Sequence, residues 1–124
     1  MPAREINKQI PQIIKFWLPV LLFMALIFFL SSIPGADIPA LFVYQDVISH
    51  LVTYFILACF FARALKHTYS NLSSLKIILY TVVFAVAYGV SDEFHQAFVP
   101  GRVVSGLDVM VDGVGSLIGG LIFH

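Results

Sequence analysis

The sequence predicts an all-α membrane protein, a bundle of four short transmembrane helices, from three observations. Of its 124 residues, 60% are hydrophobic and only 11% are charged. Its mean hydropathy of +0.95 is far above that of a soluble domain, which would need more polar residues to cover its exterior. Its apolar residues also fall into four runs, as expected for helices that cross a hydrocarbon core about 30 Å thick.

The first apolar run covers residues 13–33 and ends in a turn-forming segment. Proline removes a backbone donor and glycine tolerates turn geometry, so a loop begins there. The residues that break the run are Ser31, Ser32, Pro34, Gly35 and Pro39. The basic residues ahead of the run also resemble the start of a secretory signal peptide. No small-x-small cleavage site follows, because Pro34 would occupy the third place before a cut after Ala36, and we expect the segment to stay attached.

Three further apolar runs complete the predicted bundle. They cover residues 47–64, 75–92 and 104–123. Pro100 and Gly101 mark the turn between the last two, since this pair favours turn geometry. Phe94 and Phe98 lie close to that turn and are too apolar for a loop in water. We therefore expect an outer loop around residues 94–104 that lies in the membrane interface or re-enters the membrane.

The basic residues predict the orientation of the helices, because Lys and Arg stay preferentially on the cytoplasmic side. They precede the first predicted helix or border the loop between the second and third, at Arg4, Lys8, Lys15, Arg63, Lys66 and Lys76. Only Arg102 is left for the opposite face. Four crossings then place both termini in the cytoplasm and the two loops rich in proline and glycine outside.

The acidic residues show the opposite distribution. All except Glu5 lie in or beside the outer loops, at Asp37, Asp46, Asp92, Glu93, Asp108 and Asp112. At about 1.5 Å per helical residue, the segment after Asp112 reaches only about 18 Å and cannot span the membrane alone. Asp112 is therefore expected below the outer hydrocarbon boundary. An ionisable group at that depth faces the bundle interior or water and is a candidate for function.

Helical phase gathers the polar residues into stripes, because residues four apart share a face. The stripes are Asp46 with His50 and Tyr54, Gly89 with Asp92, Glu93 and Gln96, and Asp108 with Asp112 and Ser116. On the last helix, the spacing of Gly115 with Gly119 and of Ser116 with Gly120 lets helix backbones approach closely. The sequence thus predicts one polar layer near the outer end, made of Asp46, His50, Asp92, Glu93, Gln96, Arg102, Asp108 and Asp112.

Polar residues between Ser31 and Gly120 also follow a specific order. It reads Asp46-x3-His50-x3-Tyr54, then Tyr88-Gly89-x2-Asp92-Glu93-x2-Gln96-x-Phe98-x-Pro100-Gly101-Arg102, then Ser105-x2-Asp108 and Gly115-x3-Gly119. This order resembles the signature of the VanZ-like membrane proteins, a family named for an accessory protein of low-level resistance to the glycopeptide teicoplanin. The resemblance implies a single VanZ-like domain over residues 1–124, in the bacterial plasma membrane. Val47 stands where the family often has Lys, and Asp112 where Asn is usual, which adds a negative charge.

These residue types suit three kinds of chemistry. Asp46, His50, Asp92 and Glu93 can hold a divalent cation such as Mg²⁺ or Mn²⁺, and Glu93, His50 and Asp92 are the candidates for acid–base catalysis. The guanidinium of Arg102 can hold a phosphate or carboxylate through two hydrogen bonds. The candidates for ligand binding are Asp46, Tyr54, Gln96, Arg102, Ser105, Asp108 and Asp112.

Together these observations predict an outward-facing polar site that binds a lipid phosphate of the cell envelope or a related ligand, and the resemblance implies a link to teicoplanin resistance. Three alternatives stay open: a membrane hydrolase or transferase acting on lipid-linked phosphate, a polar network that only closes the bundle, and proton-coupled transport. In the second, Arg102 pairs with Glu93 or Asp108. The zero net charge argues against a nucleic-acid partner and leaves the lipid bilayer as the expected surroundings.

Overall fold

The computed structural model describes residues 3–124, apart from the side chains of residues 5 and 6, and the regular structure of that part is entirely helical. The elements are α1 (Ala3–Ser31), a short 3₁₀ helix η1 (Gly35–Asp37), α2 (Gln45–Thr68), α3 (Ser74–Gln96) and α4 (Gly106–Phe123). Each of the four α-helices is long and apolar enough to cross a membrane. The predicted all-α membrane fold is confirmed. The side chain of Glu5, the one acidic residue predicted away from the outer loops, lies outside the described part.

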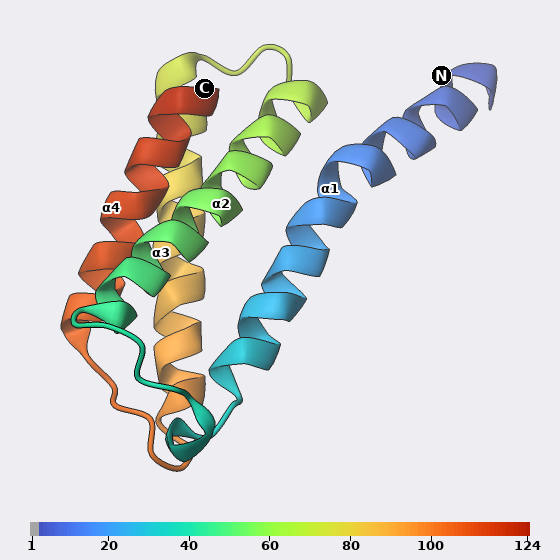
Figure 1. The fold of residues 1–124 in the computed structure, drawn as a ribbon. Helices are drawn as coiled ribbons and strands as arrows, with labels where there is room; N and C mark the ends of the chain where they lie inside the picture. Colours follow the sequence, from blue (N-terminus) through green and yellow to red (C-terminus); the bar gives the residue numbers. More distant parts are fainter. Residues whose placement is uncertain (1–2) are drawn as a thin grey trace.

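The helices alternate in direction, so the connections fall at two ends of the bundle (Figure 1). One end carries the α1–α2 and α3–α4 connections and is called here the two-loop end. The other, called here the termini end, carries the α2–α3 connection together with both chain termini. Every acidic residue whose side chain is described lies at or near the two-loop end. Its predicted position outside the cell stays a prediction.

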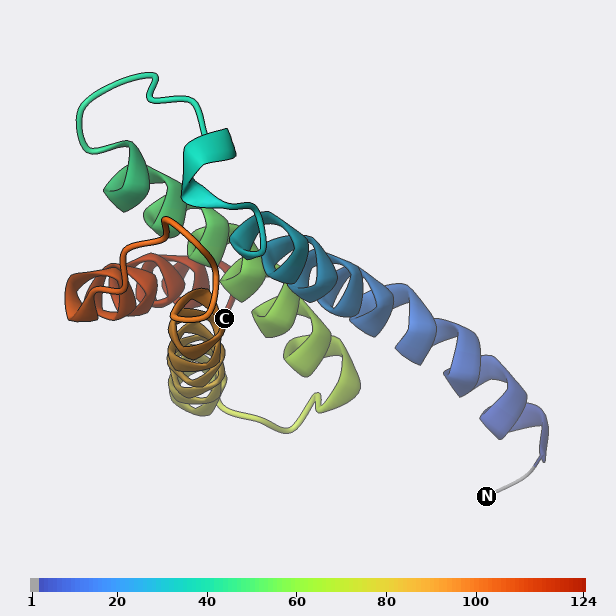
Figure 2. The same ribbon diagram turned by 90° about the horizontal axis from the view of Figure 1, so that it is seen from below.

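Helices α2, α3 and α4 pack side by side, whereas α1 leans away from them toward its N-terminus (Figures 1 and 2). Midway along, the buried Val20 and Ile27 of α1 join a core that includes Tyr54 and Leu57 of α2 and Ala85 of α3. The large hydrophobic side chains on the outside of the helices are exposed, which is the arrangement that a lipid environment stabilises.

Small residues let α4 approach its neighbours closely, as the spacing on this helix predicted. A Cβ added to Gly119 would lie 2.8 Å from the Cβ of Ala58 and 2.8 Å from the backbone oxygen of Phe55, both on α2. One added to Gly115 would lie 2.5 Å from the backbone oxygen of Leu51. These short distances show that α2 and α4 touch backbone to backbone, so their polar side chains near the two-loop end are held at fixed separations.

Helices α1, α2 and α3 are longer than the apolar runs that predicted them, whereas α4 begins two residues after its predicted start at residue 104. Helix α1 begins at Ala3 rather than near residue 13, and α2 continues to Thr68 rather than ending near residue 64. Helix α3 ends at Gln96, beyond the predicted limit of residue 92. Charged and polar residues such as Glu, Gln and Lys form helices readily, so a loss of hydrophobicity does not end a helix by itself. Glu93 and Gln96 are therefore presented on a helix.

The two connections at the two-loop end are fastened to each other. The backbone N–H of Gly35 donates to the backbone oxygen of Pro100 at 2.9 Å. Gly101 adopts a φ of +74°, and a Cβ added to Gly35 would overlap the backbone of Gly101. The segment after α3 lies across the end of the bundle (Figure 2). This contact needs glycine on both sides and holds the loops over the polar layer.

Candidate functional site

His50 lies between two carboxylates of the facing helix α4. Its Nδ1 is 2.8 Å from Oδ1 of Asp112, and its Nε2 is 3.8 Å from Oδ2 of Asp108. The first distance is that of a hydrogen bond, and since a carboxylate accepts, Nδ1 carries the proton in this pair. When the ring is neutral, its Nε2 has a free lone pair and faces Asp108.

Asp112 is fully buried, with 0% of its surface exposed. Its second oxygen, Oδ2, has no hydrogen-bond partner among the described residues. This oxygen occupies the space that a side chain at Gly89 would fill, because a Cβ added there would lie 2.6 Å from it. The predicted stripe on α3 therefore includes Gly89 for a steric reason: its missing side chain makes room for the Asp112 carboxylate.

Glu93 approaches the same place from α3. It is 5% exposed, and its Oε2 accepts a hydrogen bond from the backbone N–H of Ser105 at 3.2 Å. Ser105 caps α4, where its own hydroxyl oxygen accepts from the backbone N–H of Leu107. The other oxygen of Glu93, Oε1, is buried without a partner among residues 3–124. The α3–α4 connection thus fixes the Glu93 carboxylate and leaves one oxygen free.

Three side chains from three helices bring donor atoms together. One atom each from His50, Glu93 and Asp108 lies within 4.8 Å of the others. Asp108 lies in the first turn of α4, where the helix dipole favours a negative charge. The sequence grouped His50 and Glu93 with Asp46 and Asp92 as a metal-binding set; in the structure, Asp108 is the carboxylate that joins them.

Asp46 and Asp92, the remaining members of that set, have different surroundings. Asp46 lies in the first turn of α2, is exposed, and makes no side-chain hydrogen bond to the described residues. Asp92 is 7% exposed and lies on α3 together with the buried Gln96. Asp46, Asp92 and Gln96 all line a cavity between α1, α2 and α3. They therefore line the same cavity as His50.

Tyr54 lies one helical turn below His50, with their rings parallel and 6.2 Å apart. It is 1% exposed, and its hydroxyl group has no hydrogen-bond partner within the described part of the chain. A buried hydroxyl without a partner is costly, since it has lost its water and gained nothing. Tyr54 lines the same cavity as His50 and Asp92. Tyr54 thus adds an unused donor to the cavity.

Arg102 holds the end of α1. Its Nε donates to the backbone oxygen of Ile33 at 2.8 Å and one of its terminal nitrogens to that of Leu30 at 2.5 Å. The last carbonyls of a helix lack intrahelical partners and attract a cation, so this contact stabilises the end of α1. The pairing with Glu93 or Asp108 expected in the structural alternative is not observed. A guanidinium has five N–H donors, and two such bonds leave others for a ligand.

His95 belongs to this region although the sequence did not single it out. Its Nδ1 lies 2.9 Å from the hydroxyl of Ser31 and its Nε2 3.3 Å from that of Ser32, and its ring stacks on Phe28 at 4.3 Å. These contacts tie α3 to the end of α1. The only signal in the sequence was a histidine within the polar segment that ends α3, since the two serines read as loop residues.

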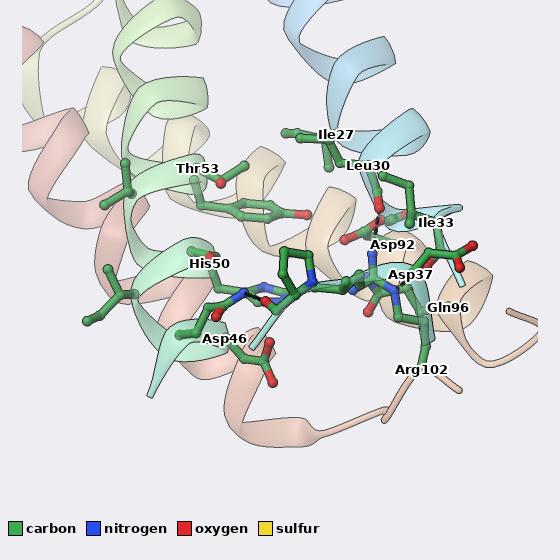
Figure 3. A pocket seen from close by; sticks show the side chains of 18 residues that line it. Ile27, Leu30, Ile33, Asp37, Asp46, His50, Thr53, Asp92, Gln96 and Arg102 are labelled. Carbon is green, nitrogen blue, oxygen red and sulfur yellow. Dashed lines mark hydrogen bonds between the residues drawn. The ribbon is translucent and has the colours of Figure 1, made fainter. Parts of the chain in front are cut away.

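The cavity itself has a volume of about 580 Å³ (Figure 3). Apolar side chains form one part of its wall, at Ile27, Leu30, Ile48 and Val52. Polar side chains form another, at Asp46, His50, Asp92, Gln96 and Arg102. A pocket of this size suits a small molecule or part of a lipid, and its mixed wall suits an amphipathic one.

Four apolar helices with a buried polar layer at one end define a multi-pass membrane protein that holds ionisable groups among its helices. Such groups mark binding, transport or catalytic sites in membrane proteins. The assignment to multi-pass membrane proteins rests on the whole fold rather than on any single residue. A family model described as VanZ/LLP1 matches residues 16–124, and the chain belongs to this VanZ-like family. No curated protein and no solved structure gives a significant match to the chain.

Proposed function

We propose that the chain binds a lipid phosphate of the cell envelope, or a related amphipathic anion, in the cavity between α1, α2 and α3. The observation that carries this proposal is the mixed wall of the cavity, which joins apolar side chains such as Ile27 and Val52 to polar ones such as Gln96 and Arg102. A lipid headgroup with the start of its chain has the same two-part character. The bacterial plasma membrane supplies such lipids.

Arg102 is the residue that favours a phosphate among amphipathic ligands. It borders the cavity, keeps free N–H donors beyond its bonds to Leu30 and Ile33, and is held in place by those bonds. A positioned guanidinium binds a phosphate more favourably than a mobile one, because less side-chain freedom is lost on binding. The neighbouring Gln96 and Tyr54 supply neutral donors that an anion also accepts.

Titration of the detergent-purified chain with farnesyl phosphate, followed by calorimetry, tests the proposal. We expect saturable binding that weakens about tenfold or more in Arg102→Met, which corresponds to about 1.4 kcal/mol. Lys76→Met, an exposed change at the termini end, is the matched control and leaves the affinity unchanged. Farnesol and inorganic phosphate, tested separately, show whether both halves of the ligand contribute. Equal affinity of the wild type and Arg102→Met for farnesyl phosphate would contradict the proposal.

A membrane hydrolase or transferase acting on lipid-linked phosphate is the second candidate. The hydrogen bond between Asp112 and Nδ1 of His50 favours it, because a carboxylate in this position orients an imidazole to act as a general base through Nε2. Release of phosphate from a lipid diphosphate, lost in His50→Gln, distinguishes catalysis from binding. A link to teicoplanin resistance, which rests on membership of the VanZ-like family alone, is tested by the teicoplanin susceptibility of a host that expresses the wild type or Arg102→Met.

The proposed ligand requires the two-loop end to face the outer leaflet. Cysteine accessibility in whole cells, with Cys59 replaced by serine, examines this orientation. We expect a probe that cannot cross membranes to label Val103→Cys, which is 80% exposed in the α3–α4 connection, and not Asn71→Cys in the α2–α3 connection. The positive-inside distribution of Lys and Arg is the reason. The reverse labelling pattern would place the cavity on the cytoplasmic side.

A further inference from the structure

The cluster of His50, Glu93 and Asp108 has an excess of negative charge. Asp112 joins the cluster through its hydrogen bond with His50, so three carboxylates surround one imidazole. Within the described part of the chain, His50 is the only basic side chain that pairs with any of them. A buried carboxylate is costly unless it is paired, coordinated or protonated. Even with His50 protonated, two of the three negative charges are not balanced by a paired side-chain cation among the described residues.

Glu93 supplies a separate sign of a missing ligand. The exposed fraction of this residue of the cluster is only 5%. Its Oε1 is buried and has no hydrogen-bond partner among the described residues. Its Oε2 is held by the backbone N–H of Ser105. The carboxylate is thus anchored through one oxygen and presents the other, as a metal-binding carboxylate does when its second oxygen is hydrogen-bonded.

We propose that His50, Glu93 and Asp108 bind a divalent transition-metal ion, Mn²⁺ or Zn²⁺, and that Asp112 is the residue that positions His50. One imidazole nitrogen with two carboxylate oxygens is a donor set for these ions, whereas Mg²⁺ and Ca²⁺ prefer oxygen donors alone. Asp112 accepts the Nδ1 proton at 2.8 Å and so leaves Nε2, the nitrogen that faces Asp108, as the donor to the metal.

The distances fit this assignment after a small adjustment. Metal bonds of about 2.0–2.2 Å place two ligand atoms on one ion at most about 4.4 Å apart. The three donor atoms lie within 4.8 Å of one another, and Nε2 of His50 is already 3.8 Å from Asp108. The three side chains come from α2, α3 and α4, which pack side by side, so a bound ion would also join these helices.

This metal site does not depend on the proposed lipid ligand. His50 lines the cavity between α1, α2 and α3, whereas Glu93 and Asp108 are not among the residues that line it. A cation bound there would place positive charge next to a cavity whose wall carries Asp46 and Asp92. It would thereby favour an anionic ligand, although metal binding is measured without one.

Titration of the full chain in detergent with Mn²⁺, after treatment with a chelator, tests the assignment. The electron paramagnetic resonance signal of free Mn²⁺ gives the affinity and the number of sites. We expect one site, and a loss of about 100-fold or more in Glu93→Gln and Asp108→Asn, since each removes a direct ligand. Asp112→Asn is expected to lose about 10–100-fold, the usual effect of changing the partner of a metal-bound histidine.

Two further variants separate this set from its alternatives. Asp46→Asn tests the other carboxylate near His50, and Asp37→Asn, exposed in η1, is the matched control. Both should bind Mn²⁺ within about twofold of the wild type. The electron spin echo of bound Mn²⁺ should show modulation from a coordinated imidazole nitrogen in the wild type and none in His50→Gln. Elution volumes in size-exclusion chromatography confirm that each variant folds. Wild-type binding no tighter than that of the His50→Gln, Glu93→Gln, Asp108→Asn triple variant would overturn the proposal, as would loss in Asp46→Asn with retention in Asp108→Asn.

Discussion

The two ends of the bundle handle polar groups in opposite ways. At the termini end, the polar side chains of Lys66, His67 and Lys76 are exposed, and aromatic rings make the contacts between helices. At the two-loop end, polar side chains are themselves buried between helices, at Asp92, Glu93, Gln96, Asp108 and Asp112. The atoms buried without a described partner, on Tyr54, Glu93 and Asp112, all belong to that end.

This difference separates the part of the molecule that stabilises the fold from the part that is available for function. Stacked rings and close backbone contacts lower the free energy of the folded state. Buried carboxylates without partners raise it, because they lose hydration without full compensation. A chain with no use for the polar layer would be more stable with apolar residues there, so the comparison itself favours a ligand over a purely structural network.

The largest expected effect on stability comes from the termini end. Phe61 of α2 stacks on Phe84 of α3 at 4.1 Å and meets the edge of Trp17 of α1 at 5.6 Å, so it joins three helices. We expect Phe61→Ala to lower the free energy of unfolding by about 2–3 kcal/mol, since the site is partly buried. Unfolding in mixed detergent micelles with increasing dodecyl sulfate measures this.

The same variant should leave the other end unaffected. Its folded fraction is expected to bind Mn²⁺ as tightly as the wild type, because no ring of this aromatic group touches His50, Glu93 or Asp108. Leu79→Ala, a change at an exposed position of α3, is the control for lost hydrophobic volume and should alter stability by less than about 0.5 kcal/mol. If Phe61→Ala abolished metal binding while folded, the division between the two ends would be wrong.

A smaller effect of opposite sign is expected at the two-loop end. Glu93→Met replaces a buried, half-partnered carboxylate by an apolar side chain of similar length. Exchanging buried ionic groups for apolar ones is often neutral or stabilising, so we expect the metal-free protein to gain about 1 kcal/mol. Part of that gain is offset by the lost bond to the backbone N–H of Ser105.

The thermal midpoints of chelator-treated samples, with and without added Mn²⁺, measure this effect. Ser91→Met, exposed on the same helix, controls for the methionine itself. The wild-type midpoint should rise with Mn²⁺ and that of Glu93→Met should not, because an ion that binds only the folded state stabilises it. A clear drop in the stability of metal-free Glu93→Met would show that the carboxylate holds the helices together, as the structural alternative requires.

Sequence alone predicted the helices and the polar end because both depend on local patterns. Apolar runs reveal membrane spans. Counting residues also shows that the segment after Asp112 is too short to span the membrane alone, so Asp112 must lie within the membrane. The partners were harder to predict, because they depend on how far each helix is rotated. Asp46 shares a helix face with His50, yet it lies in the first turn of α2 and is exposed, while Asp108 and Asp112 reach His50 from α4.

Arg102 and His95 illustrate a second limit. A lone arginine near several acidic residues suggested an ion pair or an anion clamp, but its observed partners are backbone carbonyls at the end of α1. Backbone groups are the same at every residue and leave no mark in the sequence. The serines that bond His95 were equally hidden, because Ser31 and Ser32 have the composition of a loop although they complete a helix end.

The smallest effect concerns a polar contact at the termini end, where the comparison predicts that such contacts contribute little. Nε1 of Trp17 donates to the hydroxyl of Thr68 at 2.7 Å in an exposed position. Trp17→Phe keeps an aromatic ring beside Phe61 but removes this donor, and both groups can bond water or lipid headgroups instead. We expect a loss of about 0.5 kcal/mol or less in the same micelle unfolding assay. Thr68→Val removes the acceptor, and the double variant should add no further loss, since the two changes delete one bond. A loss near 2 kcal/mol would mean that the termini end also depends on polar pairing, which would contradict the division between the two ends.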